Sequence, residues 1–412
     1  MKPADVIIIG GGAAGFFTAI SAADLSADRV GKNPPLKIII LERGKEVLTK
    51  VKVSGGGRCN VTHAEFLPKE LSKNYPRGEK ELLGPFHTFM TGDTVAWFEK
   101  RGVALKIEDD GRMFPVSDSS QTIIDCFLSE AKRLGVEVLL NHSVKEIEKD
   151  GEVFHIKTSN GTFSTSKVVV ATGSNPKIWK LLEGLGHSIV PPVPSLFTFN
   201  IKDARIIDLP GLSTVASVKI LDAKGKCLLE SSGPLLITHW GLSGPAILKL
   251  SAWGARLLEP LKYHFKITVN WMNDIPEEDV IESLRAMKTS RGKQTIYKYA
   301  QFELPKRLWQ NLVKASGIDE RLTWADASRE NLQNLANQLA ASIFEVTGKS
   351  TFKEEFVTAG GVDLKEVNFK TFESKKVENL YFAGEVLDID AITGGFNFQN
   401  AWTGGFIVSR SL

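Results

Sequence analysis

Cysteine is scarce in this chain, and so is net charge. Only three cysteines occur among the 412 residues, at Cys59, Cys126 and Cys227, and they are too scattered to indicate a disulfide framework or a zinc site. No pair has CxxC or CxxxxC spacing, which argues against a dithiol–disulfide reductase. The net charge is only +3 and no dense basic tract stands out, so we expect no nucleic-acid partner.

Long apolar runs are also lacking. None approaches the roughly 20 residues that a membrane-spanning helix needs, and the run at Val6–Ile9 begins too early and is too short for a signal peptide. We therefore expect no membrane partner, a cytoplasmic location and a small-molecule substrate. The oligomeric state is left open.

The remaining composition is typical of a soluble globular enzyme or binding protein, with 42% hydrophobic and 24% charged residues. A chain of this length is too long for one ordinary domain, so we expect two or three. The most informative segments are glycine-rich and lie near both ends of the chain. Together they predict one dinucleotide held at both halves, with FAD as the favoured cofactor.

The amino-terminal glycine segment follows the buried run Val6–Ile9 and precedes an Ala-rich predicted helix, and it fits the pattern G-x-G-x-x-G. Gly10 permits the tight turn from strand to helix, Gly12 lets the backbone approach a pyrophosphate, and Gly15 lets the helix pack close to the strand. Ala13 and Ala14 fall at the amino end of the helix, where unpaired N–H groups attract an anion.

An acidic partner for this segment lies at the end of a second buried run, Leu36–Glu42. Glu42 stands 27 residues beyond Gly15, where a carboxylate can accept hydrogen bonds from both ribose hydroxyls and disfavour a 2′-phosphate. The alternative is a solvated glutamate before a turn.

Three consecutive glycines occupy the segment from Ser54 to Asn60. They expose backbone N–H groups and admit a cofactor at contact distance, while Arg58 would supply positive charge to the pyrophosphate or the flavin ring. The segment is no P-loop because the Lys-Ser/Thr ending is missing. A flexible loop is the alternative, and Cys59 is more readily a packing residue than a catalytic thiol.

The carboxyl-terminal glycine segment, from Asn379 to Gly405, predicts a strand, an acidic loop, a glycine turn and a helix. Gly384 ends the strand, and Glu385 and Asp388 lie in the loop, where they would bind ribitol or pyrophosphate. The amino end of the helix after Gly395 would stabilise negative charge on a reduced isoalloxazine. A merely capped helix is the alternative.

The sequence pattern changes in the middle of the chain. The segment KVVVATG predicts a buried strand whose end, Thr172-Gly173, lines the cofactor. The prolines at 191, 192 and 194 indicate a domain crossing. Alternating segments after them predict antiparallel strands, and residues 277–340 predict amphipathic helices.

The predicted fold class is therefore α/β, a discontinuous Rossmann-like FAD-binding domain with an inserted antiparallel β subdomain and a helical portion. We expect residues 1–194 to form the first part of the FAD-binding domain. Residues 195–343 would form the insertion, and residues 344–412 the second part.

Several segments together resemble the BaiN/YhiN-like family of NAD(P)/FAD-dependent flavoproteins, which includes sequences described as aminoacetone oxidases. The match runs almost end to end and is carried by IIIGGGAAG, LERGKEVLTKVKVSGGGRCNVTH, GRMFPVSD, THWGLSGPAILKLS, TAGGVDLKEV and LYFAGEVLDIDAITGGFNFQNAW. Phe396 stands where the family pattern leads us to expect a tyrosine, which removes a hydroxyl.

The resemblance implies a set of FAD contacts in all the segments described above. These are Gly10, Gly12, Gly15, Glu42, Arg43, Ser54, Gly57, Arg58, Cys59, Gly173, Gly384, Asp388, Gly395 and Asn397, with the backbone of Val144 at the adenine.

The first functional hypothesis is an FAD-dependent oxidoreductase in which flavin N5 passes hydride from NAD(P)H to an unsaturated or carbonyl-containing organic substrate. No residue pair stands out as general acid and base, and no metal site is indicated. A second hypothesis is an oxidase of a small amine such as aminoacetone, and a third is a non-catalytic flavin-binding redox sensor.

Overall fold

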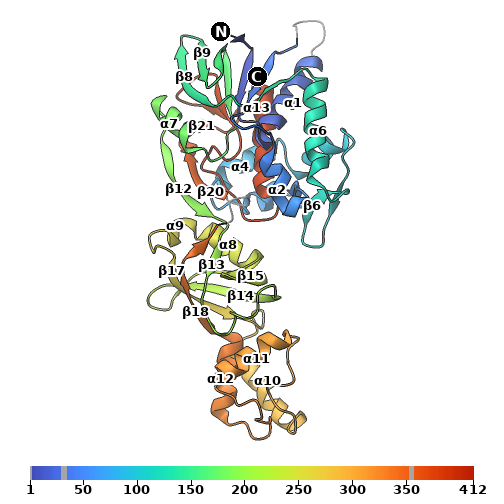
Figure 1. Cartoon of the computed structure of the whole chain (residues 1–412), viewed down its shortest axis with the longest axis vertical. Helices are drawn as coiled ribbons and strands as arrows, with labels where there is room; N and C mark the ends of the chain where they lie inside the picture. Colours follow the sequence, from blue (N-terminus) through green and yellow to red (C-terminus); the bar gives the residue numbers. More distant parts are fainter. Residues whose placement is uncertain (1, 29–34, 352–356) are drawn as a thin grey trace. The chain divides into compact units, whose positions relative to one another are not determined.

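The computed structural model describes residues 2–28, 35–351 and 357–412. The chain divides into two compact units, one made of residues 1–193 and 353–412, the other of residues 194–352. In Figure 1 the segment coloured blue to green and the red end of the chain thus belong to one unit, and the yellow-green to orange segment forms the other. We call them the flavin unit and the inserted unit.

The flavin unit is built on a seven-stranded sheet. In spatial order its strands are β21 (Val367–Asn368), β22 (Glu373–Ser374), β23 (Leu380–Phe382), β11 (Lys167–Val170), β2 (Val6–Ile9), β3 (Ile38–Leu41) and β7 (Glu137–Leu139). The five strands from β23 to β7 are parallel. Strands β2, β3 and β23 are buried along their whole length, and β11 is buried after its first residue, as expected for a parallel sheet covered on both faces.

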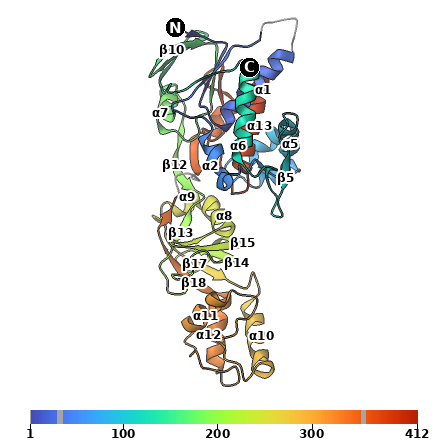
Figure 2. The ribbon, with the colours of Figure 1, turned by 45° about the vertical axis from the view of Figure 1, so that its right-hand side comes forward.

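Helix α1 (Ala13–Asp28) and the carboxyl-terminal helix α13 (Phe396–Ser411) lie side by side in this unit (Figure 2). They approach closely because α13 carries Gly405 at the crossing, where a Cβ would lie 2.9 Å from Thr18 Oγ1. Aromatic rings add to the packing, since Phe17 of α1 stacks on Trp97 with centroids 4.4 Å apart and contacts Trp402 of α13 at 5.2 Å.

Smaller sheets and shorter helices complete the flavin unit. The sheets are β1 (Lys2–Pro3), β10 (Gly161–Thr165), β9 (Val153–Thr158) and β8 (Val144–Asp150); β4 (Thr62–His63), β6 (Arg112–Pro115) and β5 (Leu105–Ile107); and β12 (Ile189–Ser195) with β20 (Val357–Val362). The helices are α2 (Thr49–Gly57), α3 (Pro68–Ser72), α4 (Glu79–Phe86), α5 (Thr91–Glu99), α6 (Ser120–Arg133) and α7 (Pro176–Gly184).

The inserted unit combines an antiparallel sheet with helices around one hydrophobic core. The sheet runs β18 (Ser342–Thr347), β17 (His264–Asn270), β14 (Ser213–Leu221), β15 (Cys227–Thr238), β16 (Gly241–Ser243), β13 (Thr198–Asn200) and β19 (Lys349–Ser350). The helices are α8 (Pro245–Trp253), α9 (Ala255–Leu258), α10 (Glu277–Ser290), α11 (Lys306–Ala315) and α12 (Arg329–Ala340). The α/β class with an inserted antiparallel sheet and a helical portion is confirmed.

The end of the insertion differs from the sequence-based boundary at residue 343. Strand β18 pairs along its length with β17, and β19 pairs with β13, so residues 344–350 belong to the inserted sheet rather than to the flavin unit. The physical reason is that alternate residues of β18 are buried in the core of the inserted unit.

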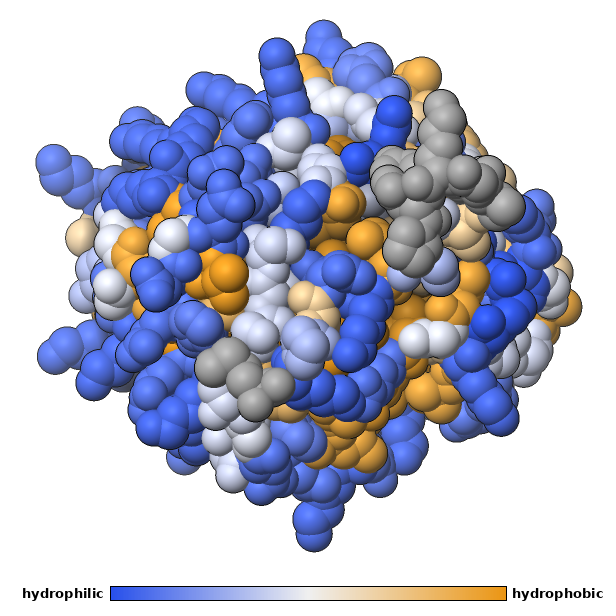
Figure 3. All heavy atoms as spheres, turned by 90° about the horizontal axis from the view of Figure 1, so that it is seen from above, coloured by the Kyte–Doolittle hydropathy of each residue, from blue (hydrophilic) through white to orange (hydrophobic). Residues whose placement is uncertain are grey.

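The surface mixes polar and apolar residues. The face in Figure 3 is mainly hydrophilic, with smaller hydrophobic areas between the charged side chains. Among the described residues, no helix has the length and apolar character that crossing a bilayer requires.

Candidate functional site

Loops from four neighbouring strands meet at one edge of the main sheet. Glu42 follows β3, Gly10 follows β2, Thr172-Gly173 follows β11, and Gly384 follows β23. Because these strands are adjacent and parallel, their carboxyl ends lie at the same edge, which is where open α/β sheets bind ligands. The structure thus brings together residues from both ends of the chain.

The glycines of the first turn differ in how much space surrounds them. A Cβ on Gly15 would lie 2.0 Å from the carbonyl oxygen of Gly10, and a Cβ on Gly10 would lie 2.4 Å from the carbonyl oxygen of Ala171. Both positions therefore require glycine for close packing of backbone on backbone. A Cβ on Gly12 would meet nothing within 4 Å, so this position faces open space beside Ala13 and Ala14 in the first turn of α1.

Glu42 is half-buried, and its carboxylate already accepts two backbone hydrogen bonds. Gly11 N–H donates to Oε2 at 2.9 Å and Gly44 N–H donates to Oε1 at 2.7 Å. A carboxylate offers about four acceptor positions, so two remain for ribose hydroxyls. The neighbouring Arg43 is exposed.

Val144 begins β8 shortly after a backbone contact with Glu42. Two residues before it, His142 N–H donates to the carbonyl oxygen of Glu42 at 2.8 Å. Val144 is buried and lies opposite Thr158 in the four-stranded sheet. The sequence-predicted adenine contact and the predicted ribose contact therefore come from neighbouring segments.

Helix α2 adjoins the glycine turn and ends in a left-handed kink. Leu48 N–H donates to the carbonyl oxygen of Gly11 at 2.8 Å. At the other end, Ser54 leaves the helical conformation, and Gly55, Gly56 and Gly57 have φ angles of 58°, 68° and 84°. Glycine adopts such angles without strain. The triple glycine is therefore a defined turn that directs the chain toward Arg58 and Cys59.

Arg58 is engaged by two carboxylates. Its Nη1 atom lies 2.5 Å from Glu108 Oε1 and 3.4 Å from Asp118 Oδ1, and its guanidinium carbon lies 3.9 Å from the centroid of the Phe114 ring. Nearby carboxylates offset the positive charge, so Arg58 has less capacity to stabilise an anion than its place in the sequence suggests.

Cys59 is fully buried, and burial raises the pKa of its thiol to about 12. Cys126 is also buried, whereas Cys227 is exposed. Because the thiolate is the reactive form, we expect a disulfide-exchange reagent at pH 8 to label one thiol per native chain and three after denaturation. Rapid labelling of Cys59 in the native protein, located by peptide mapping, would contradict this.

The loop after β23 contacts the amino-terminal helices. A Cβ on Gly384 would lie 3.2 Å from Ala14 Cβ, and Glu385 Oε2 forms an ion pair with Lys50 Nζ of α2 at 2.7 Å. Further along, Asp388 N–H donates to the carbonyl oxygen of Val362 at 3.1 Å. The acidic loop is thus fixed beside the first turn of α1.

The start of α13 is held tightly by β4. A Cβ on Gly395, whose φ is 96°, would lie 2.5 Å from the carbonyl oxygen of Thr62. Phe396 stacks on His63 with ring centroids 4.5 Å apart. The side-chain amide of Asn397 exchanges two hydrogen bonds with the backbone of Ala391, so it shapes the loop before the helix.

The sequence reasoning missed a buried polar network under this helix. Gln399 is fully buried, and its Oε1 accepts hydrogen bonds from Thr62 at 2.6 Å and Thr94 at 3.0 Å. Its Nε2 donates to Thr403 at 3.1 Å. The network joins segments more than 300 residues apart, and the only sequence signal was a glutamine on the apolar face of a predicted helix.

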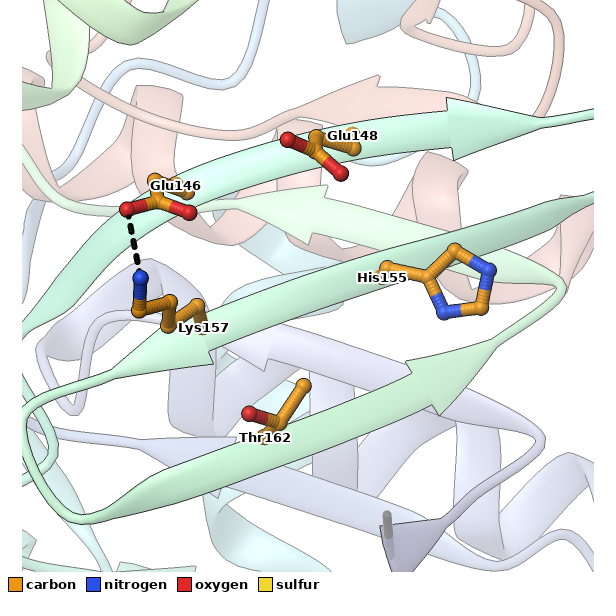
Figure 4. A pocket seen from close by; sticks show the side chains of 5 residues that line it. All are labelled: Glu146, Glu148, His155, Lys157 and Thr162. Carbon is orange, nitrogen blue, oxygen red and sulfur yellow. Dashed lines mark hydrogen bonds and ion pairs between the residues drawn. The ribbon is translucent and has the colours of Figure 1, made fainter.

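A hollow of about 280 Å³ lies elsewhere in the flavin unit, on the sheet formed by β8, β9 and β10 (Figure 4). It is lined by Glu146, Glu148, His155, Lys157 and Thr162, with Lys157 Nζ 2.9 Å from Glu146 Oε1. None of the predicted cofactor residues lines it. Nor do the described residues include a group of three His, Cys, Asp or Glu side chains placed to hold a metal ion.

The residues at the sheet edge fit a dinucleotide. The first amides of α1 have no intrahelical acceptors, and the space above Gly12 admits a pyrophosphate beside them. Glu42 retains acceptor positions for a ribose.

Comparison with known proteins supports this interpretation. The model of the HI0933-like protein Rossmann domain matches residues 4–411. The chain is 29% identical to the ribosomal RNA dihydrouridine synthase of Escherichia coli K12, over 100% of this chain and 98% of that protein. It is 27% identical to the 3-dehydro-bile acid delta(4,6)-reductase of Clostridium scindens, over 98% of both chains. The structure of 3-ketosteroid delta1-dehydrogenase from Sterolibacterium denitrificans shares the fold, with a TM-score of 0.52 at 11% identity over 100% of this chain and 99% of that one.

Proposed function

This chain belongs to the HI0933-like Rossmann family, the flavoprotein family that its sequence resembles, and is an FAD-dependent oxidoreductase; we propose that it catalyses NAD(P)H-linked reduction of a carbon–carbon double bond conjugated to a carbonyl group. The observation that carries the proposal is the meeting of the Gly10–Gly15 turn with the loop after Gly384 at one sheet edge. That edge would provide a single site for both halves of the cofactor.

The chain's own residues would bind and orient the cofactor. The first turn of α1 would hold the pyrophosphate, with Gly12 leaving it room, and Glu42 would accept hydrogen bonds from the ribose. The amino end of α13 would stabilise negative charge at the flavin ring, with a smaller contribution from Arg58, whose charge Glu108 and Asp118 offset. The bound flavin would supply two-electron hydride transfer at N5.

The substrate chemistry is inferred from what two full-length relatives have in common. Forming dihydrouridine saturates the C5=C6 bond of uracil, which is conjugated to the C4 carbonyl. A 3-dehydro-Δ4,6 reductase saturates double bonds conjugated to a ketone. Saturating one such double bond takes two electrons and two protons, which NAD(P)H and one further proton would supply through the flavin. Two full-length relatives at 29% identity are ribosomal RNA dihydrouridine synthases, and one at 27% is the bile-acid reductase. We therefore take a uracil base in RNA as the first substrate to test, with a small enone as the alternative.

Anaerobic mixing of the purified, FAD-loaded protein with NADH and then NADPH tests the proposal. We expect one of them to bleach the flavin absorbance, and a uridine-containing RNA or a 3-keto-Δ4,6-steroid to restore it. Inertness to both nucleotides would contradict the proposal. Peroxide formation with small amines would then support an amine oxidase, and no turnover with any substrate a redox sensor.

A further inference from the structure

We propose that the helical portion of the inserted unit carries a preformed contact surface for RNA, made by Arg291, Lys293, Lys298, Tyr299 and Arg321. We call it the basic loop surface. The choice of RNA among polyanions rests on the proposed function. The surface itself rests on charge, exposure and packing within the inserted unit.

Charge is concentrated in this part of the chain. Residues 285–321 contain nine Lys and Arg against three Asp and Glu, a net charge of +6, whereas the whole chain carries +3. The small net charge of the whole chain therefore conceals a local excess of positive charge. The expectation of no nucleic-acid partner was based on that net charge, so it does not apply to this segment. Phosphate contacts by such cations supply most of the affinity of nucleic-acid binding.

The cations of the basic loop surface are exposed, and acidic side chains do not compensate them. Across the described ranges, the side-chain nitrogens of Arg291, Lys293, Lys298 and Arg321 form no ion pair with an Asp or Glu carboxylate within 4.0 Å, although the backbone N–H of Arg321 donates to Asp319 Oδ1 at 2.8 Å. Lysines on the sheet of the same unit differ, since Lys219 pairs with Glu230 at 3.6 Å and Lys266 pairs with Glu345 at 3.8 Å. Unpaired cations are free to meet phosphates without first breaking an ion pair.

Backbone hydrogen bonds bring these residues together. The loop 291–299 runs beside residues 321–325, because Ala325 N–H donates to Gly292 O, Trp324 N–H to Gln294 O and Ile296 N–H to Leu322 O, each at 3.0 Å. The two segments also form a bridge between Thr295 and Thr323. Arg321 thus lies beside the loop that carries the other cations.

The loop is anchored in the core, so the surface is ordered before any ligand binds. Ile296 and Trp324 are fully buried, and Trp309 Nε1 of α11 donates to the carbonyl oxygen of Ile296 at 2.8 Å. A fixed surface loses little conformational freedom on binding, which favours affinity.

Aromatic rings accompany the cations. Tyr299 is 44% exposed, with Lys298 Nζ 5.6 Å from its ring centroid. Cations interleaved with exposed aromatic rings are typical of surfaces that bind unpaired nucleotides, because bases stack on the rings while phosphates meet the charges. The basic loop surface therefore fits a looped or single-stranded RNA better than a polyanion that has no bases to stack.

The test measures binding of a 24-nucleotide RNA stem-loop with a uridine-rich loop to the full-length, FAD-loaded protein over a range of salt concentrations. In the variant R291Q/K293Q/K298Q/R321Q we expect affinity to fall at least about tenfold and the slope of log K against log salt to flatten by about 3. The matched control K219Q/K224Q/K226Q/K266Q makes the same charge change on the sheet and the β14–β15 turn of the same unit, and it should bind as the wild type does.

A second variant separates stacking from charge. Tyr299→Ala should weaken RNA binding about fivefold or more without changing the salt slope. It also keeps the proposal testable if the quadruple variant melts early or loses its flavin. Equal weakening in both quadruple variants would overturn the proposal, as would unchanged binding in the loop variants or a preference for anionic vesicles or polyglutamate over RNA.

Reduction of the bound flavin by NAD(P)H is recorded for every variant. One outcome is that the loop variants lose RNA binding while NAD(P)H reduces the flavin of no protein, the wild type included. That outcome would support the basic loop surface and reject the proposed reaction. Normal flavin reduction together with wild-type RNA binding in the loop variants would support the proposed reaction and reject the basic loop surface.

Discussion

Gly15→Ala is expected to yield a protein that retains little FAD and melts about 6 to 10 °C below the wild type. The added Cβ would lie 2.0 Å from the carbonyl oxygen of Gly10. Neither atom can rotate away, because the oxygen belongs to the backbone and the backbone fixes the position of the Cβ. Helix α1 must then move off the end of β2, at a cost of about 3 kcal/mol, which corresponds to that shift in a unit of this size. Calorimetry and the ratio of flavin to protein absorbance measure the two effects.

Gly12→Ala is the matched control, because the same methyl group is added three residues earlier in the same turn. Its Cβ would meet nothing within 4 Å, so the melting temperature of the FAD-free protein should stay within about 1 °C of the wild type. FAD affinity should nevertheless fall, since the methyl group occupies the space proposed for the pyrophosphate. Full FAD occupancy in Gly15→Ala, or wild-type affinity in Gly12→Ala, would contradict the proposed position of the cofactor.

The strands around the site could be predicted because short apolar runs in the local sequence indicate buried strands. Val6–Ile9 is a short apolar run followed by Gly10, and Val168–Val170 is another, followed three residues later by Gly173; each lies in a strand of the parallel sheet. The Ala-rich helix predicted after the first glycine turn is α1, which begins at Ala13. A run of β-branched residues followed by a glycine turn restricts the chain before any tertiary contact forms.

The polar partners of the site could not be predicted, because they come from distant segments. Glu108 lies 50 residues beyond Arg58, and nothing in either segment indicates that they pair. The conformation of the triple glycine was equally hidden, since glycine allows both a flexible loop and the fixed left-handed turn that the structure shows. The insertion boundary was misplaced for a similar reason, because β18 resembles a strand of either unit until its pairing with β17 is known.

Asp390→Ala should be the most destabilising single change in the loop between β23 and α13. Asp390 is fully buried, and both of its carboxylate oxygens accept hydrogen bonds from the guanidinium of Arg77. Removing the carboxylate leaves a largely buried cation without its main counter-ion, which costs about 3 to 5 kcal/mol. We expect the melting temperature to fall by about 10 °C and FAD to be released, because this loop positions the start of α13.

Two controls distinguish the buried charge from a general loss of ion pairs. The double variant R77M/D390L removes both charges and should be more stable than Asp390→Ala, because no unpaired charge remains inside. Lys157→Met breaks an exposed pair with Glu146, whose side chains are 59% and 50% exposed, and should change stability by less than about 1 kcal/mol. If Asp390→Ala melts within about 2 °C of the wild type and keeps its flavin, then the loop does not depend on this pair, and the contacts of Gly395 with Thr62 and of Phe396 with His63 suffice to hold the start of α13.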